Sequence, residues 1–444
     1  MLALAASPLP VRAAAFDVAA YGAKPDGTTL NTAAIQQAID AAAKAGGGVV
    51  VFQPGVYLSG ALFLKSGMEL RLDEGVEIRG VQDLAAYPVM QTRVAGIEMP
   101  WPSALINVYR QARVKIGGKG SIDGDGKIWW DKYWKMRRQD YEPIGLRWAA
   151  DYDCRRPRLI QVYDSTDVEV RGLTLKRSGF WTVHICYSRR VTVDGVTIRN
   201  NIGGRGPSTD GVDIDSSSDV LVAHCDIECN DDAICLKAGR DADGLRVNRP
   251  TEKIRIYDNT VRGGEAGVTI GSETSGGIRD VDVKGLTVLS PVPAGILFKS
   301  ATTRGGTIEN IAIADVTTVG VATSVSISLN WNPAYSYAKM PEGDSPALPA
   351  GMKEMPDYWK VLTAVVPPGK GMPHFRHVLI SGWKSTGAQR AFAVSSSADS
   401  PLVDFTFRDI EIEAKTAGTI ANAQGWKMEN VHVKTLDGTI PLVK

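Results

Sequence analysis

Val168-Glu-Val-Arg-Gly-Leu-Thr-Leu175 shows a pattern that returns along the whole middle of this chain. The pattern is apolar-x-apolar-x-x-apolar-x-apolar, so two alternating halves are separated by a bend of two residues. Side chains alternate between the two faces of a strand, and such a bend keeps the apolar side chains of both halves on one side. Each copy therefore predicts two short strands that face one interior. Further copies, some of them partial, begin at Val191, Val220, Ile254, Val281 and Ile311.

The spacing of the copies indicates a solenoid. Consecutive copies start 23 to 34 residues apart, and a unit of this size cannot bury its apolar face without stacking on its neighbours. A leucine-rich repeat would show a Leu and Asn spacing that is missing here, and a propeller blade would need about 40 residues and four strands. We therefore expect an all-β fold, a single-stranded right-handed parallel β-helix of about ten coils.

A capping helix and two interruptions complete the expected layout. Asn31 is a candidate N-cap for a short helix over residues 32–44, which would cap the N-terminal end of the solenoid. Residues 127–158, rich in Trp and Arg, and residues 331–377, rich in Pro, break the repeat and are predicted to be long loops. Residues 16–444 are thus expected to form a single β-helix domain.

Composition argues against several classes of function. The 444 residues carry a formal net charge of +1, so no excess charge predicts binding to nucleic acid or to a membrane surface. No run of about 18 apolar residues predicts a transmembrane helix. Residues 1–15 are small and apolar, as in the remnant of a signal peptide, and we expect a periplasmic or secreted protein. The five cysteines form no CxxC pair and are expected to be buried or singly paired, without a chemical role.

Carboxylates are concentrated in one segment, and the repeat brings them together. Asp210 precedes the pair Asp231-Asp232 by about one coil. Residues one coil apart stack at a spacing of about 4.8 Å, so the three carboxylates should lie side by side on the outer surface. Stacked carboxylates raise one another's pKa and do not stabilise a solenoid, whereas cleavage of a glycosidic bond needs one protonated and one ionised carboxyl group. A calcium site or a solvated acidic ridge would also fit this spacing.

At these residues the chain resembles glycoside hydrolase family 28, the polygalacturonase and rhamnogalacturonan hydrolase family. That family carries the motifs Asn-Thr-Asp, Gly-Asp-Asp, Gly-His-Gly and Arg-Ile-Lys, in this order. Here they read Ser208-Thr-Asp210, Asn230-Asp-Asp232, Gly264-Glu-Ala266 and Leu297-Phe-Lys299. The resemblance covers nearly the whole chain. It implies a catalytic β-helix domain that hydrolyses α-linked galacturonic acid bonds in pectic polysaccharide, with inversion at the anomeric carbon.

The resemblance also implies a role for each residue that matches a motif. Asp231 resembles the general acid, while Asp210 and Asp232 resemble the pair that holds and deprotonates the attacking water. Lys299 resembles the cation that grips a galacturonate carboxylate, and the neighbouring Asn230 is a further candidate for substrate binding. Inversion implies roughly 6.5–9.5 Å between the acid and base carboxyl groups, and the general acid needs a raised pKa.

Two positions depart from the family pattern, and both are candidate substrate contacts. Glu265 stands where the motif histidine would be, and Leu297 stands where the motif arginine would be. In the family, that arginine and the lysine bind the carboxylate of the sugar on the leaving-group side of the cut. Loss of the arginine suggests a different sugar there, such as a neutral rhamnose against Leu297. We therefore favour a rhamnogalacturonan-type or decorated pectin over homogalacturonan, with exo action if residues 127–158 block the groove.

Two other functions fit the same residues. A polysaccharide lyase on this scaffold would bind Ca²⁺ with carboxylates, for which Asp213, Asp215, Asp231 and Asp232 are candidates, and Lys237 would be its base. Lys237 is also a candidate substrate contact in the hydrolase. In a non-catalytic carbohydrate-binding solenoid, the missing histidine and arginine would reflect the loss of a former active site. Retention of the three aspartates argues against such a loss. For the hydrolase we expect no metal and no cofactor, a pectic oligo- or polysaccharide as the partner, and a monomer.

Overall fold

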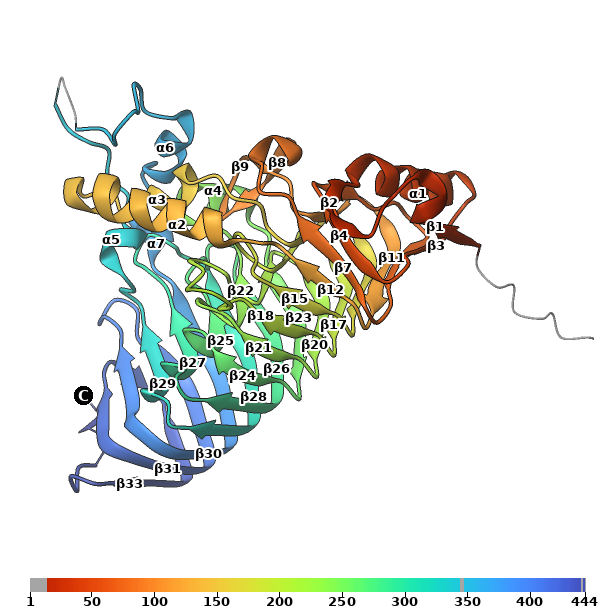
Figure 1. The fold of residues 1–444 in the computed structure, drawn as a ribbon. Coiled ribbons are helices and arrows are strands. Elements are labelled where there is room, and N and C mark those ends of the chain that lie inside the picture. The colour runs from red at the N-terminus through yellow and green to blue at the C-terminus, as the bar shows by residue number, and fades with distance from the viewer. Residues whose placement is uncertain (1–13, 344–346, 441, 444) are drawn as a thin grey trace, which may run out of the picture.

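The computed structural model describes residues 14–343, 347–440 and 442–443, and its strands wind into a parallel β-helix (Figure 1). Connections between parallel strands of this kind are right-handed. The predicted fold is confirmed, and the predicted repeat starts all fall within one ladder of parallel strands. This ladder includes β14 (Thr166–Arg171), β17 (Arg189–Asp194), β20 (Ser218–Ala223), β23 (Thr251–Tyr257), β26 (Ile278–Leu289), β28 (Thr307–Val319), β30 (His374–Ser395), β31 (Leu402–Ile420) and β33 (Lys427–Thr435).

The bend inside each repeat depends on its second residue, which has a positive φ. Gly172 (71°) and Gly195 (64°) hold this position in two successive coils, and His224 (53°) and Asp258 (55°) hold it in the next two. Glycine adopts this conformation without strain, and Asp and His are enriched among the other residues that adopt it. The bend joins β14 to β15 (Thr174–Lys176), and the apolar residues of both strands are fully buried: Val168, Val170, Leu173 and Leu175.

A second column of strands carries the acidic segment. It runs through β13 (Ile160–Tyr163), β16 (Val183–Cys186), β19 (Val212–Asp215), β22 (Ile234–Lys237), β25 (Ala266–Ile270), β27 (Ala294–Lys299) and β29 (Thr323–Ser328). In this column Val212 lies opposite Ile234, so Asp210 is level with Asp232 rather than with Asp231. Because side chains alternate along a strand, Lys237 and Lys299 point outward from β22 and β27 while their apolar neighbours fill the interior.

The predicted N-terminal helix is confirmed as α1 (Thr32–Lys44), and it lies at the N-terminal end of the solenoid (Figure 1). Its buried face consists of Ile35, Ala38, Ile39 and Ala42. Asn31 holds the N-cap position, but its side chain does not cap the helix. Instead it bonds to the backbone of residues 24 and 29 in the preceding turn, at 2.7–3.0 Å.

Both interruptions of the repeat, predicted as long loops, contain helices. The first holds α2 (Lys127–Met136), η3 (Arg137–Tyr141), η4 (Glu142–Ile144) and α3 (Ala150–Asp153), and the second holds α5 (Pro333–Ser336), α6 (Asp357–Leu362) and α7 (Pro368–Gly371). The aromatic rings of Trp129, Trp130 and Tyr133 are buried on one face of α2. Trp148 meets Trp359 of the second interruption at a ring distance of 5.1 Å. The two interruptions thus share a hydrophobic core outside the solenoid.

An antiparallel hairpin, β8 (Val89–Val94) and β9 (Ile97–Pro102), lies on the same side of the solenoid as these helices (Figure 1). All five cysteines are buried and free. No helix within the described residues is long and apolar enough to cross a membrane. The predicted signal remnant falls mostly on residues 1–13, which lie outside the described residues.

Candidate active site

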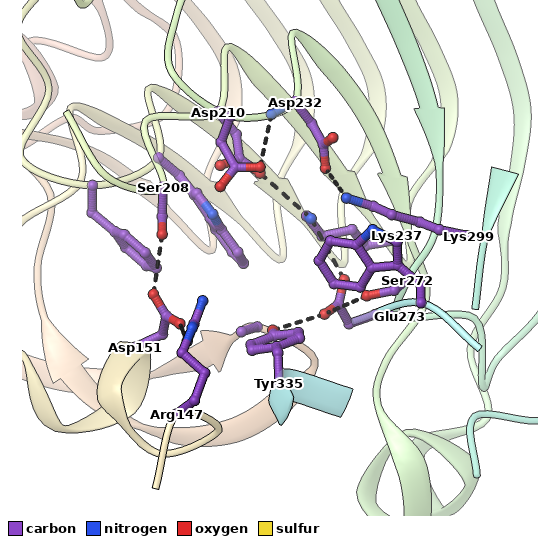
Figure 2. Close-up of a pocket in the computed structure, with 15 residues that line it drawn as sticks. Arg147, Asp151, Ser208, Asp210, Asp232, Lys237, Ser272, Glu273, Lys299 and Tyr335 are labelled. Carbon is purple, nitrogen blue, oxygen red and sulfur yellow. Dashed lines mark hydrogen bonds and ion pairs between the residues drawn. The ribbon is translucent and has the colours of Figure 1, made fainter. Parts of the chain in front are cut away.

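The acidic segment opens into one pocket between the second strand column and the two helical interruptions (Figure 2). Asp210, Asp231 and Asp232 all line it, together with Lys237 and Lys299. The loops that lead into β19 and β22 supply the aspartates, and the strands β22 and β27 supply the lysines. Three carboxyl groups and two ammonium groups therefore converge in a space that holds about 460 Å³, open solvent included.

Asp232 is held as a carboxylate. Its Oδ2 accepts a hydrogen bond from Nζ of Lys299 at 2.7 Å, and its Oδ1 accepts one from Oγ1 of Thr269 at 2.7 Å. Burial alone would raise the pKa of Asp232. The positive charges of Lys299 and Lys237, with these hydrogen bonds, outweigh burial and lower the pKa below its ordinary value.

Asp231, the next residue, shifts in the opposite direction. Its side chain is only partly exposed, and burial followed by the charge of Asp232 raises the pKa of Asp231 to about 7. Lys299 opposes this shift without cancelling it. Two adjacent carboxyl groups with pKa values driven apart can serve as an acid and a base at the same pH.

Lys237 stands between three further carboxyl groups. Its Nζ lies 3.5 Å from Oδ2 of Asp210, 3.5 Å from Oδ1 of Asp213 and 3.5 Å from Oε2 of Glu273. Burial and then the charge of Asp213 raise the pKa of Asp210 well above its usual range. Burial also raises the pKa of Asp213 to about 7. Because so many acids crowd one buried lysine, they share protons instead of all ionising.

The two helical interruptions close one side of the pocket. Tyr335 donates its hydroxyl hydrogen to Oε1 of Glu273 at 3.1 Å, and the Arg147 guanidinium lies 5.3 Å from the centre of the Tyr335 ring. Arg147 also pairs with Asp151 at 2.6 Å, and Asp151 accepts a hydrogen bond from Ser208 at 3.1 Å (Figure 2). This chain of contacts links the second interruption, the first interruption and the loop that carries Asp210.

Comparison with known proteins agrees with this geometry. The model of the family described as glycosyl hydrolases family 28 matches residues 54–343, which contain the whole pocket. The chain belongs to this family. Family 28 is a family of glycoside hydrolases, so the resemblance noted in the four motifs is confirmed.

Individual relatives of this family 28 chain are named as pectin-degrading enzymes. A "Probable polygalacturonase" of Vitis vinifera is 30% identical over 71% of this chain and 63% of its own length. An "Exo-poly-alpha-D-galacturonosidase" of Dickeya chrysanthemi is 24% identical over 95% of this chain and 74% of its own length. Among solved structures, a hyperthermoactive exopolygalacturonase from Thermotoga maritima superposes with a TM-score of 0.79 at 28% identity, over 95% of this chain and 92% of that one. This chain thus spans less than two thirds of the Vitis protein.

The other predicted substrate contacts of this family 28 chain lie around the pocket, with one exception. Asn230 and the exposed Glu265 line a second hollow that adjoins the pocket at Asp231. Leu297 lies on the outer face of β27 but is only 9% exposed, packed with Ala266 and Ala294, and it does not line the pocket.

Several residues of the pocket were not singled out from the sequence. Trp331 and Tyr335 belong to the second interruption, where no repeat pattern reveals which side chains face the column. Glu273 follows strand β25, and it belongs to none of the four motifs and to no copy of the repeat. The Trp331 ring lies 4.2 Å from Nζ of Lys299, and it therefore helps to fix the lysine that holds Asp232.

Within the described residues, two groups combine three possible metal ligands. Asp210, Asp232 and Cys235 form one group, in which Lys299 already binds Asp232. The second group consists of His184, Cys186 and Asp215, and there Nη1 of Arg93 lies 2.9 Å from Oδ1 of Asp215. A cation that already binds the carboxylate makes either group a poor fit for a metal ion.

Proposed function

We propose that this chain is an exo-acting, inverting hydrolase that releases galacturonic acid from the ends of pectic polysaccharide. One observation carries the proposal: Asp231 and Asp232 are adjacent, share one pocket and have pKa values shifted in opposite directions. A protonated carboxyl group beside an ionised one is the pair that hydrolysis of a glycosidic bond requires.

In the proposed mechanism, Asp231 donates its proton to the glycosidic oxygen as the bond from that oxygen to the anomeric carbon breaks. Asp232 takes a proton from a water molecule, which attacks the same carbon from the opposite face, and Asp210 helps to hold that water. The positive charges of Lys237 and Lys299 favour a galacturonate carboxylate in the pocket. The products are two shorter sugars, and the elements of water are divided between them.

Closure of the pocket supports exo action. Tyr335, Arg147 and Glu273 close one side, so an end sugar would enter the pocket and a chain passing through it would be blocked. The names of the Dickeya and Thermotoga relatives agree with this reading. The test is product size on homogalacturonan: mono- or disaccharide alone from the first minutes is expected, and a ladder of oligomers would contradict exo action.

The identity of the preferred pectin remains a prediction. The sequence favoured a rhamnogalacturonan-type or decorated backbone because Leu297 would contact a neutral sugar, but Leu297 is nearly covered and does not line the pocket. Release of reducing ends from homogalacturonan, rhamnogalacturonan and xylogalacturonan, with Asp231→Asn as the blank, identifies the substrate. Faster turnover of rhamnogalacturonan than of homogalacturonan would bear out the preference. Activity retained by the Asp231→Asn variant would refute the assignment of Asp231 as the general acid.

The lyase alternative finds less support in the site. Asp215 is paired with Arg93 and Asp232 with Lys299, so two of its candidate calcium ligands are occupied. Although burial lowers the pKa of Lys237, surrounding acids raise it well above its ordinary value, and a lysine that stays charged is a poor base. An unsaturated product absorbing near 235 nm, lost on addition of a chelator, would reverse this choice.

A further inference from the structure

The mechanism assigns no role to the hollow beside the pocket. Arg147, Ser208 and Asp231 line both spaces, so the hollow is continuous with the pocket at the proposed general acid. Its remaining walls come from α2, η3, the loop around residues 204–207, Asn230 and the acidic Glu265. The hollow holds about 950 Å³, open solvent included, against about 460 Å³ for the pocket, which leaves room for a further sugar ring.

Basic side chains dominate this hollow, and two of them lack an acidic partner. Three of its five basic residues each have a carboxylate oxygen within 2.7 Å. Arg138 and Arg205 form no ion pair with a carboxylate in residues 14–343, 347–440 or 442–443, and both are exposed. Two unpaired guanidinium groups beside a catalytic acid favour an anionic group of the substrate.

Trp134 contacts both Arg138 and Arg205 at the hollow. Its Nε1 donates a hydrogen bond to the backbone oxygen of Arg205 at 2.9 Å, and the Arg138 guanidinium lies 4.8 Å from the centre of its ring. Arg205 in turn donates from Nε to Oδ1 of Asn230 at 2.7 Å, directly next to Asp231. Two guanidinium groups positioned by one indole ring match the carboxylate of an acidic sugar.

We propose that Arg205 and Arg138 bind the carboxylate of the sugar on the leaving-group side of the cut. The family would use the motif arginine and Lys299 for this, but that arginine is Leu297 here, and Lys299 faces the pocket and already binds Asp232. Asp231 stands between the pocket and the hollow, so a sugar whose glycosidic oxygen it protonates extends into the hollow. This inference rests on the proposed function and deepens it: the leaving sugar is galacturonate rather than a neutral sugar.

The test compares two disaccharides that differ only in charge. One is digalacturonic acid, and the other is the same disaccharide methyl-esterified on its reducing-end sugar alone. We expect the wild-type protein to prefer the free acid by about tenfold in kcat/KM. The double variant Arg138→Gln/Arg205→Gln should lose this preference through a higher KM for the free acid, with a much smaller effect on hydrolysis of the ester. Lys135→Gln, which removes an exposed charge from α2 outside the hollow, should keep the wild-type ratio.

The outcomes separate this inference from the proposed function. Equal wild-type rates on the two disaccharides, a double variant that keeps the wild-type ratio, or equal losses on both substrates would each overturn the inference. The proposed function would be refuted instead if the wild-type protein hydrolysed neither disaccharide and also failed to hydrolyse oligogalacturonides of greater length. Both arginines are exposed, so a thermal melt is expected to show the double variant folded.

Discussion

Nζ of Lys299 lies 2.7 Å from Oδ2 of Asp232, and both side chains are almost completely buried. The two residues come from β27 and from the loop before β22, which the stacking of coils brings together. The pair keeps Asp232 ionised, and its negative charge is one cause of the raised pKa of Asp231. This ion pair thus influences the pKa of the proposed base, Asp232, and through its charge that of the proposed acid, Asp231.

Replacement of the proposed acid gives the first prediction. Asp231→Asn keeps the shape of the side chain but has no proton of the right acidity to donate, so kcat should fall by about 10²–10⁴-fold. The side chain is partly exposed, so the variant should remain folded. Reducing-end assays on a pectic oligosaccharide check the rate. Asp219→Asn, a partly buried aspartate on β20 that does not line the pocket, is the matched control, and an equal loss in that control would show that the effect is not specific.

The second prediction concerns the pH profile. Asp231 must be protonated and its pKa is raised to about 7, so kcat/KM should fall as pH rises through about 7. Asp232 must be ionised and its pKa is lowered, so the acid limb should lie at low pH. Lys299→Met removes the positive charge that stabilises the Asp232 carboxylate, and the acid limb should therefore move to higher pH. An unchanged acid limb, even with reduced activity, would mean that Lys299 only binds substrate.

The repeat could be predicted from sequence because it is local. Alternation within residues 168–175 determines which side chains face the interior, and the recurrence of that pattern determines the stacking. The exact register was beyond reach: a separation of 21 or 22 residues fits one coil equally well, and only the pairing of Val212 with Ile234 places Asp210 level with Asp232.

The closed side of the pocket could not be predicted, since it depends on contacts between distant segments. Arg147 and Tyr335 belong to different interruptions, neither of which carries the repeat. The aromatic residues at 129, 130 and 133 do follow the spacing of a helix face, so a helix could have been predicted there from the sequence. What each interruption packs against is set by the shared core around Trp148 and Trp359.

The third prediction is that the buried Asp213 lowers the free energy of unfolding at neutral and higher pH. Asp213 is fully buried, neither of its carboxylate oxygens has a hydrogen-bond partner in the described residues, and its pKa rises from 3.8 to about 7. The folded state therefore holds a proton that the unfolded chain releases, and this contribution to stability is lost as pH rises from about 4 to about 7. Asp213→Asn cannot ionise, so it should gain ~1–3 kcal/mol over wild type at pH 8 and little at pH 4.

Denaturant unfolding at the two pH values measures this gain. Activity should fall in the same variant, because Asp213 shares Lys237 with Asp210. A gain that is equal at pH 4 and pH 8 would mean that side-chain packing, rather than ionisation, is responsible.

The fourth prediction concerns the ion pair between the β8–β9 hairpin and strand β19, which follows Asp210. Nη1 of Arg93 on β8 lies 2.9 Å from Oδ1 of Asp215 on β19, and both side chains are fully buried. Arg93→Met leaves the Asp215 carboxylate buried and uncompensated, which should cost about 3–5 kcal/mol of unfolding free energy. Arg93→Met/Asp215→Leu removes both charges and should recover most of that loss. Because Ala95 in this hairpin lines the pocket, the single variant should also lose activity, and the double variant should regain part of it. Losses in unfolding free energy that simply add in the double variant would show that the two charges do not stabilise one another.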